Sequence, residues 1–335
     1  MRKTSQSSLF LLILLLIAVF SGSFFIFEFR KFEKEISQFY LAKILIPPPK
    51  ETEPINLIFV GDIMLDRGVK YMIEEYGDGD YRFPFLKTAD YLNKADILFG
   101  NLEGPISDKG KKVGSIYSFR AKPEAIDSLK FAGFDILSVA NNHIFDYGKI
   151  AMEDTFSKLR EAKIDFVGGG FTEIEAYSPI IKEIKETKIA FLAYTSLGTS
   201  YWGARNDESG IAWLEKERME KEIKEAKNQA DLVIVSIHYG EEYFSKPTQF
   251  QISISQTAVD AGANLVIGHH PHVVQEIEKY KNGYIAYSLG NFVFDQGFSE
   301  KTMRGLMLKV LIEDSKIKEV VPIEIKINKF FQPEI

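Results

Sequence analysis

Short apolar runs alternate with amphipathic segments along most of the chain. The runs typical of buried strands lie at 55–60, 95–100, 134–139, 188–196, 230–237, 263–268 and 283–290. Segments with helical periodicity lie between several of them, at 122–133, 151–163, 214–230 and 247–262. Buried strands that alternate with helices predict an α/β fold. The last pattern, at 301–328, predicts a closing antiparallel hairpin.

The N-terminal pattern is different, because Leu9 to Phe27 contains no charged residue. Such a run is typical of a secretory signal or of a membrane-spanning helix. We favour an uncleaved anchor, since the apolar run continues past residues 21–23 and no A-x-A cleavage box closes it. Arg2 and Lys3 favour a cytoplasmic N-terminus. This orientation predicts a single-pass protein of the cell membrane with its main domain outside the cytoplasm.

These patterns divide the chain into three predicted parts. Residues 1–29 form a cytoplasmic stub and a transmembrane anchor. Residues 30–54 form a juxtamembrane segment and a proline-rich linker, since "IPPPKETEP" favours an extended backbone. Residues 55–328 form the main domain.

Composition supports a folded domain and narrows its partners. The 335 residues are 45% hydrophobic and 26% charged, which fits a packed core and not a disordered chain. Residues 1–50 carry an excess of Lys and Arg, so the net charge of −6 makes the remainder acidic. An acidic main domain argues against nucleic acid as a partner. The chain has no cysteine, which excludes disulfides and thiolate metal sites.

Polar clusters follow the predicted strands, and they contain all five histidines of the chain. Ligands bind at the carboxyl ends of strands in α/β sheets. In "GHHPH", His270 and His272 lie two residues apart, which places both imidazoles on the same side of an extended chain. A polar turn is the alternative interpretation, but several clusters at one predicted sheet edge favour a site.

Acidic and amide side chains join the histidines at this edge. Asp62 closes "FVGD", Glu103 follows a strand in "GNLEG", and Asn142 precedes His143 in "ANNH". Carboxylate, amide oxygen and imidazole without sulfur form a ligand set that suits Mn, Fe or Zn. One ion or a pair of such ions can bind a phosphate or carboxylate substrate and activate a water.

Six motifs occur in a fixed order: "FVGDIMLDRG", "GNLEGPIS", "ANNHIFDYG", "HYGEEY", "GHHPHVVQ" and "SLGNFVF". Together they resemble the CapA family, the poly-γ-glutamate capsule-synthesis proteins, over residues 55–300. That family is similar to the calcineurin-like metallophosphoesterases. The resemblance implies a four-layer αββα sandwich with two mixed sheets packed face to face. It also implies a divalent-metal site of the hydrolase type.

Carried over residue by residue, the resemblance implies roles for the polar clusters. It implies metal ligands at Asp62, Glu103, Asn142, His238, His270 and His272. His143 becomes the general acid, and Asp146 orients it. Candidates for binding the substrate are Arg67, Glu242 and Asn291.

Two residues depart from the phosphoesterase pattern. Met64 occupies the place of the histidine in the first motif, and a thioether is a poor ligand for hard divalent ions. Glu103 replaces an aspartate, so its carboxylate reaches farther by one methylene. One ion therefore loses a nitrogen ligand, which puts ordinary phosphomonoesterase activity in doubt.

Three functions remain open at this level. The first is a membrane-anchored factor of capsule or poly-γ-glutamate biosynthesis or export, which acts on an anionic polymer or a phosphate-containing precursor beside other capsule-synthesis membrane proteins. The second is a surface metallophosphoesterase without a capsule role. The third is a non-catalytic module that binds a polymer.

Overall fold

The computed structural model describes residues 5–45, 53–113 and 116–335. The chain divides into two compact units, Met1–Thr52 and Glu53–Ile335. Arg2, Lys3 and most of the predicted proline-rich linker, residues 46–52, lie outside the described residues.

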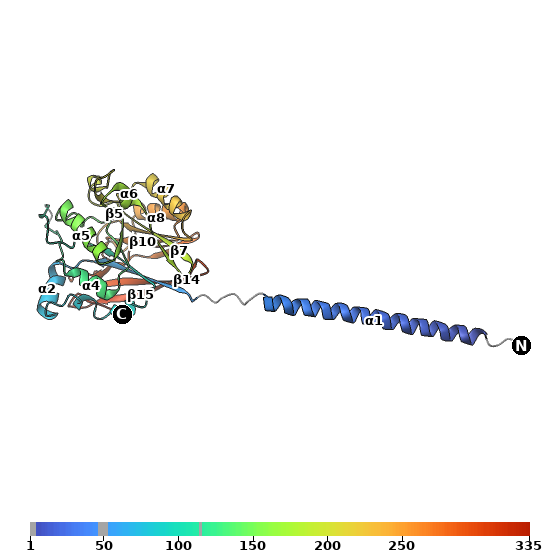
Figure 1. Cartoon of the computed structure of the whole chain (residues 1–335). Coiled ribbons are helices and arrows are strands. Elements are labelled where there is room, and N and C mark those ends of the chain that lie inside the picture. The colour runs from blue at the N-terminus through green and yellow to red at the C-terminus, as the bar shows by residue number, and fades with distance from the viewer. Residues whose placement is uncertain (1–4, 46–52, 114–115) are drawn as a thin grey trace. The chain divides into compact units, whose positions relative to one another are not determined.

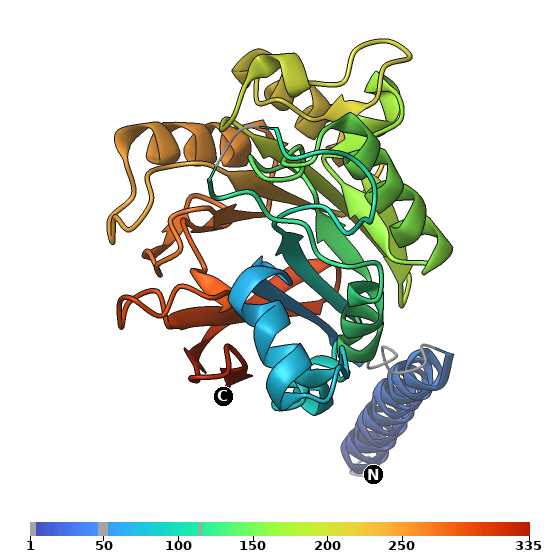
Figure 2. The same ribbon diagram turned by 90° about the vertical axis from the view of Figure 1, so that its left-hand side faces the viewer.

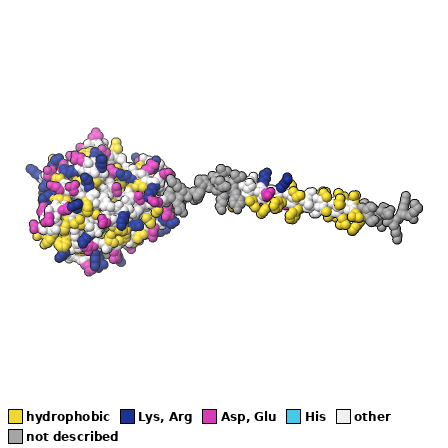
Figure 3. All heavy atoms as spheres, turned by 60° about the horizontal axis from the view of Figure 1, so that its bottom comes forward, with side chains coloured by type: hydrophobic (Ala, Val, Ile, Leu, Met, Phe, Trp, Pro, Cys, Tyr) yellow, Lys and Arg dark blue, Asp and Glu magenta, His cyan; other side chains and the backbone are white. Residues whose placement is uncertain are grey.

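The described part of the first unit is one helix, α1 (Ser5–Leu45), shown in blue in Figure 1. The helix continues through residue 30, so the predicted anchor and juxtamembrane segment form a single element. The span Phe10–Phe39 has a mean hydropathy of 2.8 and is long and apolar enough to cross a membrane. Apolar side chains cover much of this helix in Figure 3, whereas Asp, Glu, Lys and Arg intermingle on the second unit.

The second unit contains two mixed sheets. In the larger sheet the strand order is β16-β15-β14-β1-β2-β3-β4, and β13 pairs with β1. Its strands are β1 (Ile55–Ile63), β2 (Ile97–Leu102), β3 (Ile136–Ser138), β4 (Asp165–Val167), β13 (Asn291–Val293), β14 (Arg304–Glu313), β15 (Lys316–Ile327) and β16 (Pro333–Glu334). Strands β1 to β4 are parallel, and β14 joins β1 in the antiparallel sense.

The smaller sheet has the order β11-β12-β10-β9-β7-β6. Its strands are β6 (Ile180–Ile184), β7 (Thr187–Thr195), β9 (Leu232–His238), β10 (Leu265–His269), β11 (Ile277–Tyr280) and β12 (Gly283–Ala286). The four inner strands are parallel, and the edge strands β6 and β11 are antiparallel to their neighbours. A separate two-stranded ribbon pairs β5 (Gly169–Gly170) with β8 (Gly210–Ile211).

Helices cover the outer faces of both sheets (Figures 1 and 2). Their bounds are α2 (Arg67–Tyr76), α3 (Ala89–Leu92), α4 (Ala125–Ala132), α5 (Lys149–Glu161), α6 (Glu173–Tyr177), α7 (Lys216–Lys227) and α8 (Gln249–Ala261), with 3₁₀ turns η1 (Phe83–Phe85) and η2 (Ser200–Trp202). One apolar cluster joins α2, α4 and α5 to the larger sheet, and a second joins α7 and α8 to the smaller sheet.

A third apolar cluster lies between the two sheets. Phe99 of β2 stacks on Phe191 of β7, with ring centroids 6.0 Å apart and an interplanar angle of 14°. The inner parallel strands are buried on both faces, which explains their nearly continuous apolar sequences. The predicted αββα sandwich is thereby confirmed.

The closing hairpin is also confirmed, as β14 and β15. The folded unit reaches beyond the predicted limit at residue 328, because β16 pairs with β15.

Candidate metal centre

The parallel strands of both sheets end at one edge of the sandwich, and the predicted site residues lie there. From the larger sheet come Asp62 near the end of β1, Glu103 directly after β2 and Asn142 in the turn after β3. From the smaller sheet come His238, the last residue of β9, and His270 and His272, which lie in the turn directly after β10. The structure therefore brings together the six side chains that the sequence predicts as metal ligands.

Asp62 reaches this edge because β1 passes very close to β13. A Cβ on Gly61 would lie 1.9 Å from the carbonyl oxygen of Gly290, so only glycine allows this approach. The neighbouring backbone N–H of Asp62 donates to that same oxygen at 3.0 Å. The side chain of Asp62 is fully buried.

The turn after β10 holds two imidazoles in unusual backbone conformations. His270 and His272 have φ values of 97° and 57°. Positive φ costs a residue with a side chain about 1–3 kcal/mol, and it persists where the surroundings fix the geometry. Here the N–H of His270 donates to Asp62 Oδ2 at 3.3 Å, and His272 Nδ1 lies 3.0 Å from Asn291 Oδ1.

Hydrogen bonds determine which nitrogen of His272 faces the site. When Nδ1 donates to Asn291, Nε2 keeps a free lone pair for an ion. Nε2 lies 3.6 Å from Glu103 Oε1. On the other side of the site, Asn142 Oδ1 lies 2.8 Å from His238 Nε2, and the rings of His238 and His270 are 5.0 Å apart.

Among the residues that the structure describes, two sets of donor atoms are close enough to hold an ion. In each set, the donor atoms all lie within 4.8 Å of one another. One set is Asp62, Glu103 and His238, all buried, and the other is Glu242, His270 and His272. Glu242, which we predicted to contact the substrate, therefore also offers a carboxylate to an ion.

Burial and mutual repulsion determine the charges of the ion-free site. Burial, together with the neighbouring Asp62, raises the pKa of Glu103 well above its usual value. Burial alone would raise the pKa of Asp62 as well, but contacts with His269 and His272 outweigh it and hold that pKa well below the usual value. Two carboxylates this close resist sharing a buried site as anions.

The pKa values of the site histidines are also shifted in opposite directions. Burial and the neighbouring His270 hold the pKa of His238 well below its usual value, and burial and His272 lower the pKa of His270 to about 3. Both rings are therefore neutral at physiological pH and keep lone pairs for a metal. Burial opposes charge on His272, but Glu103 and Asp62 outweigh it and raise the pKa of His272 to about 9.

The residues present fit a divalent transition metal. Oxygen and imidazole donors converge without sulfur, which suits Mn, Fe or Zn. Glu103 Oε1 is buried and makes no hydrogen bond within the described part of the chain. A cation is the partner that such an oxygen lacks, because a buried unpaired carboxylate oxygen is costly.

His143 and Asp146 form a pair beside these donors. His143 Nδ1 lies 2.8 Å from Asp146 Oδ2, which also accepts the N–H of Phe119 at 2.7 Å. The Phe119 ring packs on the imidazole at a centroid distance of 4.1 Å. Nε2 of His143 lies 3.9 Å from Glu103 Oε1, so this nitrogen faces the carboxylate of the site.

The other predicted residues have different surroundings. Arg67 is about one-third exposed and pairs with Asp295 at 3.0 Å, and its guanidinium lies 5.2 Å from the centre of the Phe119 ring. Asn291 is fully buried, and its amide bonds His272, Gln296 and Thr302. Asn291 therefore orients His272, and a direct contact with a substrate stays a prediction.

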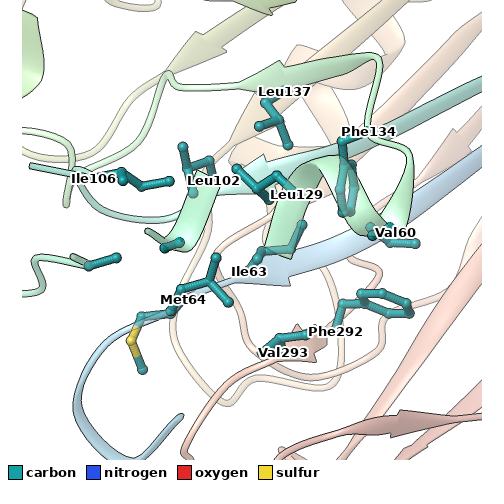
Figure 4. Packing of buried hydrophobic residues seen from close by; sticks show 14 of the residues in the cluster. Val60, Ile63, Met64, Leu102, Ile106, Leu129, Phe134, Leu137, Phe292 and Val293 are labelled. Carbon is teal, nitrogen blue, oxygen red and sulfur yellow. The ribbon is translucent and has the colours of Figure 1, made fainter. Parts of the chain in front are cut away.

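Met64 is a residue of the apolar core. It is fully buried in the apolar cluster of the larger sheet, where Figure 4 shows it beside Ile63. Its sulfur accepts the backbone N–H of Asp66 at 3.1 Å. The position at which the phosphoesterase pattern has a histidine thus belongs to the core in this protein.

Sequence reasoning missed two side chains that complete the site. Asn101 is fully buried and donates to both Asp62 and Glu103. Its place two residues before Glu103, at a strand end, was the available signal. Phe119 lies in a long connection, and no pattern in the sequence linked it to His143.

Comparisons with known proteins agree with this architecture. The family model described as "Bacterial capsule synthesis protein PGA_cap" matches residues 56–296. "Capsule biosynthesis protein CapA" of Bacillus anthracis is 36% identical over 291 residues, which cover 83% of this chain and 69% of that protein. "PGA biosynthesis protein CapA" of Bacillus subtilis (strain 168) is 34% identical over 278 residues, which cover 81% and 72%.

A solved structure described as a novel phosphatase from Mycoplasma pneumoniae has the same fold. It superposes with a TM-score of 0.51 at 17% identity, over 82% of this chain and 94% of that chain. At this identity the likeness concerns the fold alone. The family model and both relatives, in contrast, cover most of the sandwich with its motifs, and the chain belongs to the bacterial capsule synthesis protein family that those motifs predict.

Proposed function

We propose that this protein is a membrane-anchored factor of capsule or poly-γ-glutamate biosynthesis or export, with a metal-dependent site of the hydrolase type. Its substrate is an anionic polymer or a phosphate-containing precursor of one. Two relatives that are 34–36% identical carry capsule and PGA biosynthesis in their names. The observation that carries the chemical part is the convergence of buried carboxylate, amide and imidazole donors at the strand ends.

The ligands we propose for one or two divalent ions are Asp62, Glu103, Asn142, His238, His270 and His272. An ion bound there supplies Lewis acidity toward an anionic oxygen and favours the deprotonated form of a water. The neutral rings of His238 and His270 are already in the protonation state that ion binding requires. The identity of the ion follows from the donor set only as Mn, Fe or Zn.

His143 is the proton donor in this proposal. Asp146 accepts a hydrogen bond from the Nδ1–H group, which fixes the ring and directs Nε2 toward the site. A protonated Nε2 transfers its proton to the leaving group, and such a positioned acid contributes about 10²–10⁴-fold to a rate. Phe119 covers one face of the ring and limits the access of water to it.

The anchor gives the site its place in the cell. The helix α1 holds the protein in the membrane, with the sandwich outside the cytoplasm, beside other membrane proteins of capsule synthesis. A growing anionic polymer would pass on that side of the membrane. Arg67, with its planar cation near Phe119, is the candidate contact for such a polymer.

Turnover by matched variants tests this function. The full chain in detergent is incubated with Mn²⁺ and either poly-γ-glutamate or a panel of simple phosphoesters, and products are measured by size and by phosphate release. We expect the polymer to be shortened, His143→Ala to lose this activity while keeping its metal, and His270→Ala to lose both.

Turnover of simple phosphoesters with the polymer untouched would support a phosphoesterase without a capsule role. Tight polymer binding that is equal in the wild type and both variants, without any cleavage, would instead support a non-catalytic binding module.

A further inference from the structure

The side-chain amide of Asn101 lies at the centre of the carboxylate side of the site. Its nitrogen is 2.9 Å from Asp62 Oδ1, 3.2 Å from Glu103 Oε2 and 3.4 Å from His238 Nδ1. These partners are the same three residues that form one of the two possible ion-binding sets. An ion held by the donor atoms that face the amide, Asp62 Oδ1, Glu103 Oε2 and His238 Nδ1, would need the space of the amide nitrogen, because metal–ligand bonds are about 2 Å long.

The orientation of this amide is fixed by a chain of hydrogen bonds. The backbone N–H of His143 donates to Asn141 Oδ1 at 3.1 Å, which identifies the other end of the Asn141 amide as its nitrogen. That nitrogen donates to the carbonyl of Leu102 at 2.8 Å and to Asn101 Oδ1 at 3.2 Å. The remaining end of Asn101, which faces the two carboxylates, is therefore the donor NH₂ group and not an oxygen ligand.

Nitrogen atoms lie close to both carboxylate oxygens of Asp62. Oδ1 accepts from Asn101 and lies 3.2 Å from His269 Nδ1. Oδ2 accepts the backbone N–H of His270 and lies 3.3 Å from His272 Nδ1. Met64 offers no further ligand next to Asp62, since its side chain is in the core.

The uncommitted donors lie on the other side of the site. Glu103 Oε1 makes no hydrogen bond within the residues that the structure describes, and it lies 3.6 Å from His272 Nε2. His272 belongs to the second set, with Glu242 and His270. Glu103 thus directs one oxygen toward Asn101 and leaves the other for an ion at the second set.

From this geometry we infer that the centre holds a single divalent ion, and that Asn101 takes the place of a second one. Its NH₂ group donates hydrogen bonds to both Asp62 and Glu103. These bonds reduce the repulsion between the two carboxylates, as a bridging cation would. The ion then lies on the side of His270, His272 and Glu242. Asn101 is a positioning residue in this arrangement. The inference rests on the proposed function, because it concerns the number of ions at the same site.

The stoichiometry of bound metal tests this assignment. The full chain in detergent is saturated with Mn²⁺, passed through a desalting column and measured by elemental analysis. The wild type should hold one ion per chain. Asn101→Asp replaces the donor with a carboxylate between Asp62 and Glu103, and it should raise the content to two.

A matched control is Asn264→Asp. Asn264 precedes β10 at the opposite end of the strand, and its Oδ1 accepts the N–H of Val233 at 2.9 Å, a bond that aspartate also makes. This variant should keep one ion. Two ions in the wild type, or a single ion in folded Asn101→Asp, would overturn the inference.

Electron paramagnetic resonance of the wild type tests the number of bound ions, even where Asn101→Asp does not fold. Two Mn²⁺ ions in a shared site lie about 3.5–4 Å apart, so their spins couple. The single-ion centre should give an uncoupled six-line spectrum at every loading. A coupled spectrum at saturation would overturn the single-ion inference alone, whereas a wild type that binds no ion would overturn the proposed function itself.

Discussion

The imidazole of His272 lies between two buried carboxylates and has an exceptional proton affinity for a candidate ligand. Its neighbours Glu103 and Asp62 raise its pKa from 6.5 to about 9 against the effect of burial. A ring must lose its proton before it binds an ion. Ion binding near neutral pH should therefore release a proton from His272.

Metal affinity should consequently rise with pH. We expect the affinity for Mn²⁺ to increase at least about tenfold per pH unit between about pH 7 and about pH 9, because His272 loses its proton and Glu103, whose pKa is also raised, can lose another. Isothermal titration in buffers of different ionisation enthalpy measures both the affinity and the released proton. His270, with a pKa of about 3, contributes nothing in this range. An affinity that stays constant up to about pH 9 would contradict the assignment of His272.

The same ring affects the stability of the ion-free protein in the opposite direction. Its folded-state pKa lies above the unfolded value of 6.5, so the stabilisation is complete below pH 6.5 and is lost as the pH rises through about 9. Unfolding with urea in the presence of a chelator should show this loss.

Single residues also show how far the sequence predicts the site. Asn142, His238 and His270 were identified from their places at strand ends, and the structure brings them together. Asn101, two residues before Glu103, was missed, because only the register that places it opposite Asp62 reveals its contact. Met64 was read as a missing ligand, but its side chain turns into the core.

Among the elements, the close parallel pairing of β1 with β13 depends on one glycine. The carbonyl of Gly290 lies where a Cβ on Gly61 would be, so Gly61→Ala must push the two strands apart. We expect a loss of about 3 kcal/mol in the free energy of unfolding, at the upper end for overpacking. Urea denaturation of the chelated protein measures this loss.

Gly297→Ala is the matched control for that change. A Cβ there would meet only the ring of Phe331, at 3.7 Å, which is ordinary contact. Its effect should stay within about 0.5 kcal/mol. Equal effects of the two substitutions would show that the contact between Gly61 and Gly290 is not tight.

Elements were easier to predict than their pairing. The long apolar run at 230–237 identified β9 directly, because a strand that is buried on both faces has a nearly continuous apolar sequence. The parallel pairing of β13 with β1 joins segments distant in sequence, and periodicity carries no information about it. The sequence divided the chain at residue 29, but α1 continues through that boundary to Leu45.

For the whole molecule, α1 should decide where the protein resides. Leu14 and Leu15 lie within the apolar span, and a charge at the centre of a spanning helix costs about 2.5–3.5 kcal/mol. The double change Leu14→Arg and Leu15→Arg should move the full chain from the membrane fraction to the soluble fraction. Carbonate extraction followed by immunoblotting measures the distribution.

Ile174→Arg serves as the control, because this residue is exposed on the second unit. It should leave the protein in the membrane fraction. Retention of the double variant in the membrane would show that α1 is not the anchor.

The two-sheet architecture was predictable because the strand and helix patterns and the motif resemblance agree over the whole domain. What the sequence does not contain is the distance between the sheets' polar ends, which depends on the packing of residues such as Phe99 and Phe191 between them. That packing brings histidines of the smaller sheet to the carboxylates of the larger one.

The central claim is that these groups hold a divalent ion, and anomalous X-ray scattering tests it most directly. Crystals of the full chain grown with Mn²⁺ or Zn²⁺ are measured on both sides of the metal absorption edge. We expect an anomalous peak about 2 Å from nitrogens of His270 and His272. No peak at these residues at full metal saturation, or a peak only elsewhere on the protein, would contradict the account.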